Sequence, residues 1–119
     1  MQKLTYTEYK GNENILEIDL HNGYTVIAIK TWRKTSHTYK VELFIKDSAI
    51  EKWDLIEGVN LEFNTNYKFI NSAILKQMYT YLNEGFFNHY INRYEYETKC
   101  FEIGDEIFTK EGDSYTNVS

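Results

Sequence analysis

The chain has one cysteine, no proline and no long apolar run. Because Cys100 has no second cysteine to pair with, an internal disulfide and a thiolate metal cluster are excluded, and a reducing compartment is expected. No stretch approaches the roughly 18 to 20 apolar residues that span a bilayer, and the N-terminus lacks the apolar core of a signal peptide. We therefore expect a cytoplasmic protein that makes no contact with a membrane.

Positive charge is scarce in the later part of the chain. Residues 1–46 carry seven Lys/Arg and five Asp/Glu, whereas residues 47–119 carry six Lys/Arg and thirteen Asp/Glu. The two parts are therefore about +2 and −7, which gives the net charge of −5. A chain this acidic, with a pI near 5.2, does not neutralise nucleic-acid phosphates over its whole surface. It suits a partner with a basic surface.

Residue patterns typical of catalysis and of metal binding are weak. His21, His37 and His89 have no spacing that would bring metal ligands together. His89, Arg93 and Glu97 stand one helical turn apart, but such rows are usually solvated charge pairs. The sequence contains no Gly-rich phosphate loop and no nucleophile elbow. We expect no enzymatic activity, no cofactor and no metal site.

The length of 119 residues suits one domain with a two-layer core. We predict a single domain over residues 1–119, with residues 112–119 as a flexible tail. Aromatic residues reach 17%, with 11 tyrosines. A small core and its rim account for many of them, and a surplus beyond that is typical of interfaces.

Alternating polar and apolar residues predict an antiparallel sheet in the N-terminal part. The alternation is clear over residues 15–20 and 38–46. Residues 24–33 are expected as the returning strand, whose apolar run from Val26 to Ile29 indicates burial on both faces, and shorter strands are expected at 53–56, at 59–63 and within 1–14. Asn22-Gly23, between residues 15–20 and 24–33, predicts a hairpin with a type I′ turn.

One apolar face of this sheet needs a cover, which the later part of the chain supplies. Apolar residues recur at helical spacing from Ile70 to Leu82, with Asn66 as the expected N-cap. A second stripe at helical spacing runs from Phe87 to Phe108, and Gly85 stands either between two helices or inside one bent helix. The predicted fold class is α+β: an antiparallel sheet of three to five strands packed against one or two C-terminal helices.

The most acidic segment runs from Tyr94 to Asp113, with seven Asp/Glu against two lysines. If a helix continues through it, Glu95, Glu102 and Glu106 project along one exposed line. Helical positions four apart rise about 6 Å, close to the roughly 7 Å between successive phosphates of a nucleic-acid strand. The predicted partner-binding residues are Glu95, Tyr96, Glu97, Glu102, Asp105 and Glu106.

A basic and aromatic cluster at the end of the second hairpin supports an alternative. It contains Lys30, Trp32, Arg33, Lys34, His37 and Lys40. Sheets that place a hairpin in a DNA groove, or that stack bases on aromatic rings, use such residues. The alternative is a small nucleic-acid-binding module that uses Trp32, Arg33, Lys34 and Lys40.

In size, acidity, lack of proline, Lys/Asn/Ile/Tyr usage and sheet-then-helix order, the chain resembles small accessory proteins of bacteriophages and mobile elements, among them anti-CRISPR proteins. This resemblance of overall style implies a one-domain, non-enzymatic inhibitor in the cytoplasm of a bacterial host. Such an inhibitor acts as a DNA mimic on the basic surface of a Cas nuclease or another DNA-handling enzyme. A third class, a structural subunit or homo-oligomer, would require a substantial apolar surface patch.

Overall fold

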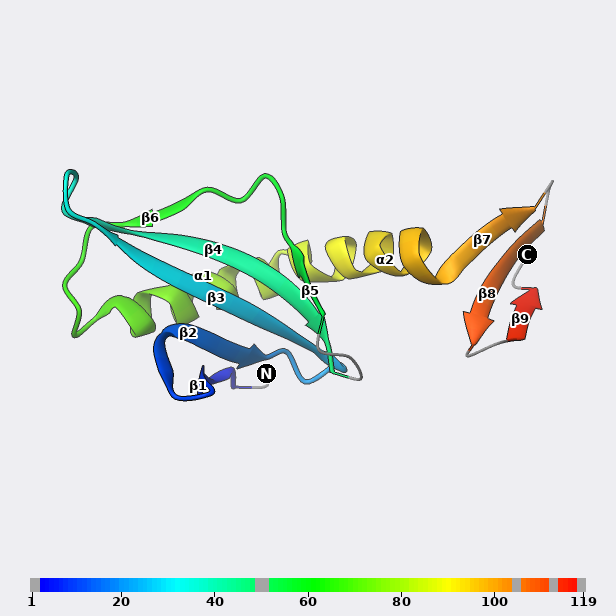
Figure 1. The fold of residues 1–119 in the computed structure, drawn as a ribbon, viewed down its shortest axis with the longest axis horizontal. Coiled ribbons are helices and arrows are strands. Elements are labelled where there is room, and N and C mark those ends of the chain that lie inside the picture. Colours follow the sequence, from blue (N-terminus) through cyan, green and yellow to red (C-terminus); the bar gives the residue numbers. More distant parts are fainter. Residues whose placement is uncertain (1–2, 49–51, 104–105, 112–113, 118–119) are drawn as a thin grey trace. The chain divides into compact units, whose positions relative to one another are not determined.

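The structure, a computed structural model, describes residues 3–48, 52–103, 106–111 and 114–117, and the side chains of these residues up to Tyr96. The chain divides into two compact units, residues 1–80 and 81–119, which are described separately. An N-terminal antiparallel sheet is followed by helices, so the predicted α+β class is confirmed (Figure 1). The single domain stays a prediction. Among the described residues, no helix combines the length and the hydropathy needed to cross a bilayer.

The unit of residues 1–80 is built on a six-stranded antiparallel sheet, one strand more than the largest number predicted. Its strands are β1 (Thr5–Tyr9), β2 (Asn12–Asp19), β3 (Tyr24–Arg33), β4 (Thr38–Asp47), β5 (Trp53–Leu55) and β6 (Leu61–Phe63). The order is β1-β2-β3-β4-β5, and β6 pairs with a different stretch of β4. β3 and β4 pair along their whole length and form the long central hairpin (Figure 1).

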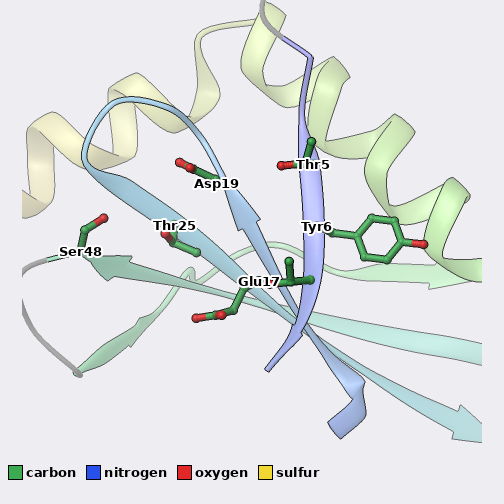
Figure 2. Close-up of a pocket in the computed structure, with 7 residues that line it drawn as sticks. Thr5, Tyr6, Glu17, Asp19, Thr25 and Ser48 are labelled. Carbon is green, nitrogen blue, oxygen red and sulfur yellow. The ribbon is translucent and has the colours of Figure 1, made fainter. Parts of the chain in front are cut away.

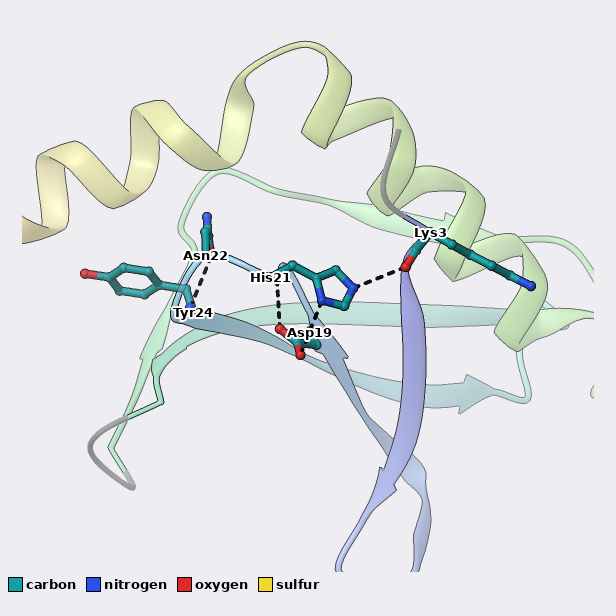
Figure 3. A network of polar contacts seen from close by, with 5 residues as sticks. All are labelled: Lys3, Asp19, His21, Asn22 and Tyr24. Atoms are coloured by element: carbon teal, nitrogen blue, oxygen red, sulfur yellow. Dashed lines mark hydrogen bonds and ion pairs between the residues drawn. The ribbon is translucent and has the colours of Figure 1, made fainter.

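The hairpin predicted between β2 and β3 is confirmed, but its predicted type I′ turn is wrong. Four residues link the two strands, and positive φ falls on His21 (61°) and Gly23 (88°). Oδ1 of Asp19 accepts a 2.8 Å hydrogen bond from the His21 N–H, and Oδ1 of Asn22 accepts a 3.1 Å bond from the Tyr24 N–H (Figure 3). These side-chain acceptors close a longer loop in place of a tight two-residue turn.

Helix α1 (Ile70–Asn83) covers one face of the sheet, as predicted. Ile70, Ile74 and Met78, at i, i+4 and i+8, form its fully buried stripe. The sheet residues of the covered face share one side by register and are at most 2% exposed: Leu16, Ile18, Val26, Ala28, Val41, Leu43 and Ile45. Burial of each large side chain contributes about 1.5–3 kcal/mol.

Asn66, the predicted N-cap, instead closes a turn before the helix, where its Oδ1 accepts a hydrogen bond from the Lys68 N–H at 3.1 Å.

The sheet coils strongly towards its opposite face, which is called the coiled face below. The rings of Tyr9 on β1 and Trp53 on β5 are 4.8 Å apart, although these strands stand at opposite ends of the order β1 to β5. In a flat sheet the two strands would lie about 19 Å apart. The register shift between Glu8 and Tyr9 marks a bulge, which increases local twist. The ring of Trp53 also contacts Phe44, the register partner of Ile27. Because of this coiling, Ile27 is fully buried.

The unit of residues 81–119 contains the whole of α2 and a second sheet. Helix α2 (Phe86–Lys99) is followed by β7 (Cys100–Ile103), β8 (Glu106–Glu111) and β9 (Ser114–Asn117), an antiparallel sheet in that order. Gly85, with φ of 74°, separates α1 from α2, which settles the choice left open by the spacing. Its N–H donates to the Leu82 carbonyl at 3.2 Å, a typical helix end. β9 lies within residues 112–119, the stretch predicted as a flexible tail.

The helix predicted as far as Phe108 is wrong beyond Lys99. The spacing of seven between Tyr94, Phe101 and Phe108 fits a helix, but Phe101 and Ile103 also alternate with polar residues, as in a strand. Two Gly-Asp pairs in the sequence, at 104–105 and 112–113, stand between the strands. In the structure the backbones of Phe101 and Phe108 are register partners in the β7–β8 pair.

Candidate functional site

The predicted acidic line along one helix is not formed. The structure places Glu95, Tyr96 and Glu97 on α2, Glu102 on β7 and Glu106 on β8, while Asp105 lies outside the described residues, as do the side chains of Glu97, Glu102 and Glu106. Because α2 ends at Lys99, Glu102 and Glu106 do not continue a helical row from Glu95. They lie instead on neighbouring strands, where the backbone of Glu106 pairs with that of Ile103.

Of the predicted partner-binding residues whose side chains are described, Tyr96 is more exposed than Glu95. It is 51% exposed, whereas Glu95 is partly buried. Arg93 and His89 are exposed about one and two turns before Tyr96 on α2, which suits the solvated row expected for them.

The structure assigns the net charge of the chain to one unit. Residues 1–80 carry ten Lys/Arg and ten Asp/Glu, and residues 81–119 carry three Lys/Arg and eight Asp/Glu. The first unit is therefore neutral, and the second carries the whole net charge of −5.

The end of the β3–β4 hairpin displays the residues of the alternative site. Trp32 is 48% exposed, and its ring lies 4.9 Å from the ring of Tyr39, its register partner, and 6.2 Å from that of His37. The cationic residues around it are the exposed Arg33 and Lys34 and the partly buried Lys40. The hairpin does bring the four predicted residues to one end of the sheet.

A carboxylate lies inside this basic cluster. Glu62 on β6 is the register partner of Lys40, and its Oε1 accepts hydrogen bonds from Oγ1 of Thr38 and, at 3.4 Å, from Oγ of Ser36. The hydrogen bond from Thr38 lowers the pKa of Glu62 below 4.5, and the charges of Arg33 and Lys40 act in the same direction. Glu62 is thus ionised at neutral pH and offsets part of the positive charge of the hairpin.

Lys30 does not belong to the exposed basic surface, because it is only 3% exposed. Its Nζ donates a 2.6 Å hydrogen bond to Oδ1 of Asn71 on α1 and lies 5.3 Å from the ring centroid of Tyr67. The hydroxyl of Tyr67 donates to Oε2 of Glu13 at 2.5 Å. Burial lowers the pKa of Lys30 below 10.5, although the negative charges of Glu13 and Glu8 oppose this.

Sequence reasoning missed this network, although one signal for it was present. Lys30 follows Val26 and Ala28 at period two, which places it on the covered side of β3. Tyr67 and Phe69, 58% and 52% exposed, lie in the segment between β6 and α1, where no periodic pattern indicates their exposure.

An open polar pocket of about 300 Å³ lies on the coiled face of the sheet (Figure 2). It is lined by Thr5, Tyr6, Thr7, Glu17, Asp19, Thr25 and Ser48. Oε1 of Glu17 pairs with Nζ of Lys46 at 3.2 Å, and Oδ2 of Asp19 lies 3.7 Å from Nδ1 of His21. Both carboxylates thus interact with groups of the protein itself. Among the described residues, no group of His, Cys, Asp and Glu side chains is arranged to hold a metal ion.

Comparison with protein-family models, curated proteins and solved structures found no match for the chain, so no role of a relative can be transferred to its residues.

Proposed function

We propose that the chain is a non-enzymatic inhibitor whose acidic C-terminal unit binds and occludes a basic, nucleic-acid-binding surface of another protein. The observation that carries this proposal is the charge division, with a neutral unit of residues 1–80 and a net −5 on residues 81–119. A field of one sign attracts an oppositely charged surface and speeds the encounter. The resemblance in style suggests a DNA-handling enzyme of the bacterial host, such as a Cas nuclease, as the partner.

The inhibitor would act by competition, because carboxylates and phosphates bind the same Lys and Arg side chains. The acidic residues of this unit come from a helix and two strands, with Glu95 on α2, Glu102 on β7, and Glu106 and Glu111 on β8. Exposed ion pairs each contribute little, so they govern the association rate more than the affinity. Tyr96, half-exposed on α2, is suited to slow dissociation as an aromatic anchor.

The alternative of duplex DNA binding by the β3–β4 hairpin alone is less well supported. Duplex binding rests on phosphate neutralisation, and the ionised Glu62 interacts electrostatically with both Arg33 and Lys40.

Charge reversal tests the proposal. The double variant Glu102→Lys/Glu106→Lys is compared with Asp54→Lys/Glu57→Lys, which makes the same change of charge at exposed positions of the neutral unit. Tagged proteins are incubated with a nuclease-treated bacterial lysate, captured proteins are identified by mass spectrometry, and the DNA binding of each purified partner is measured with the inhibitor present.

The expected result is that the wild type and the Asp54/Glu57 variant capture and inhibit a basic DNA-handling enzyme, and that the Glu102/Glu106 variant does neither. Equal capture by both variants, or capture that requires nucleic acid, would overturn the proposal.

A further inference from the structure

Three large aromatic side chains are exposed at one end of the sheet of residues 1–80. Trp32, Tyr67 and Phe69 are 48%, 58% and 52% exposed, and together they are called the aromatic surface below. Trp32 lies near the end of β3, and the other two lie between β6 and α1. The end of the β3–β4 hairpin and the start of α1 lie at the same end of this unit (Figure 1). Grouped exposed aromatic residues of this size mark interaction sites.

Contacts beneath the rings join Trp32 and Tyr67 into one surface. Tyr39 lies 4.9 Å from the ring of Trp32. The pKa of Tyr67 is raised mainly by its hydrogen bond to Glu13 and, as the smallest cause, by Tyr39, so Tyr39 contacts Trp32 and lies within electrostatic reach of Tyr67. The ammonium of Lys30, two positions before Trp32 on the same side of β3, lies 5.3 Å from the ring centroid of Tyr67.

The ring of Tyr67 and the backbone of Phe69 are held in place before any ligand binds. Tyr67 is fixed at its hydroxyl by Glu13 and backed on its ring by the buried Lys30. The backbone of Phe69 is anchored to α1, because its carbonyl accepts a 3.0 Å hydrogen bond from the Ala73 N–H. A preordered aromatic side chain loses little entropy on binding, and a ring backed by protein on one side leaves its other side for stacking.

The charges around these rings favour a polyanion. The exposed cations are Arg33, Lys34 and Lys68, and Nζ of Lys68 lies 5.6 Å from the ring centroid of Phe69. The carboxylates of the area are Glu8, Glu13 and Glu62, and Lys30 and Lys40 bring the number of cations to five against these three. Although the whole unit is neutral, this end of it therefore combines aromatic rings with an excess of positive charge.

We propose that the aromatic surface binds single-stranded nucleic acid, with bases stacked on the three rings and phosphates paired with the surrounding cations. Stacking platforms edged by Lys and Arg are the common means of binding single strands without sequence preference. A duplex keeps its bases stacked on one another and cannot use the rings. This binding is a second activity, separate from that of the acidic unit.

The test is fluorescence anisotropy with a labelled oligothymidine of about 12 nucleotides and the matching duplex, at salt concentrations from about 50 to 200 mM. The wild type should bind the single strand more tightly than the duplex, and the affinity should fall as salt rises. Tyr67→Ala and Trp32→Ala should each weaken binding about 5- to 150-fold, which corresponds to about 1–3 kcal/mol per stacked base. Trp32→Phe should retain most of the affinity, and Glu62→Gln should increase it.

Tyr6→Ala is the matched control, because Tyr6 is an exposed aromatic residue on β1 that lines the polar pocket with Ser48 and not the aromatic surface. Absence of single-strand binding by the wild type, or equal losses in Tyr6→Ala and Tyr67→Ala, would overturn the proposal. If Trp32→Ala instead abolishes capture of a protein from the nuclease-treated lysate, the surface is a protein interface. Glu102→Lys/Glu106→Lys should not weaken oligonucleotide binding, so this proposal and that of the acidic unit fail independently.

Discussion

Lys30 on β3 and Asn71 on α1 are joined by a 2.6 Å hydrogen bond in the layer between the sheet and the helix. The ammonium is almost entirely removed from water, so its hydration is replaced by one amide oxygen and the ring of Tyr67. A charged group buried in this way depends on its acceptor.

Removal of the acceptor should destabilise the protein more than removal of the pair. Asn71→Leu leaves the ammonium without its hydrogen bond and should cost about 1.5–3 kcal/mol. In Lys30→Met/Asn71→Leu no buried charge remains, so the stability should return close to that of the wild type. Urea denaturation of the two single variants and the double variant measures the coupling. Additive effects of the two substitutions would show that the bond contributes nothing.

The lowered pKa of Lys30 predicts a gain of stability at alkaline pH. Unfolded Lys30 keeps its proton up to the ordinary pKa of 10.5, whereas folded Lys30 releases it at lower pH. Between these two values the unfolded state binds more protons, so stability rises with pH. The free energy of unfolding of the wild type minus that of Lys30→Met should therefore increase towards pH 10.5. A difference that stays constant with pH would contradict the lowered pKa.

The carboxyl of Glu62 should respond to loss of the Thr38 hydroxyl. Thr38→Val keeps the branched side chain but removes the main donor, so the pKa of Glu62 should rise towards 4.5. An NMR titration of the Glu62 carboxyl carbon measures this shift. Ser36→Ala removes a longer bond and should raise the pKa less. Because the folded pKa of Glu62 is lowered, its small contribution to stability is present above the ordinary pKa and is lost as the pH falls through the folded value.

A side chain at position 85 has room around it, but the backbone conformation of Gly85 is unfavourable for any residue with a Cβ. A Cβ at this position would meet no atom within 4 Å, yet φ is 74°, in the left-handed region. Gly85→Ala should therefore destabilise the protein by about 1–2 kcal/mol, and Gly85→Asn by less. Ser72→Ala, at an exposed position inside α1, should keep or slightly raise the stability and serves as the control. A neutral Gly85→Ala variant in thermal denaturation would argue against this helix end.

The β7–β8 pair can be distinguished from a continued helix by backbone NMR. Extended-type chemical shifts are expected for residues 100–103 and 106–111, with backbone contacts between the register partners Phe101 and Phe108. A helix would instead give contacts between residues three and four apart along the same stretch. Observation of those helical contacts would contradict the second sheet.

Sequence patterns predicted the parts of this fold in which one periodicity dominates. β4 alternates over ten residues and β3 carries a continuous apolar run, and both were found almost to the residue, as was α1 with its stripe at i, i+4 and i+8. Beyond Lys99, by contrast, the spacing of seven between Phe101 and Phe108 fits a helix, whereas the alternation of Phe101 and Ile103 with polar residues fits a strand. Only cross-strand pairing decides between the two. The prediction of an acidic line along one helix was wrong because it depended on that choice.

The cluster of Trp32, Arg33, Lys34 and Lys40 was found because residues of one hairpin, which are near each other in sequence, stay close in space. Glu62, Tyr67 and Phe69 join it only through tertiary packing.

The contact between Tyr9 and Trp53 links the first and the last strand of the order β1 to β5, which lie more than forty residues apart in the sequence. In an open sheet, edge strands usually fray one at a time, each with its own small free energy of local opening. Here the loss of either edge removes a ring from the other and uncovers Ile27 and Phe44. The two edges of this sheet are therefore coupled in local unfolding, and the sheet gains some of the cooperativity of a closed barrel without hydrogen bonds between its first and last strands.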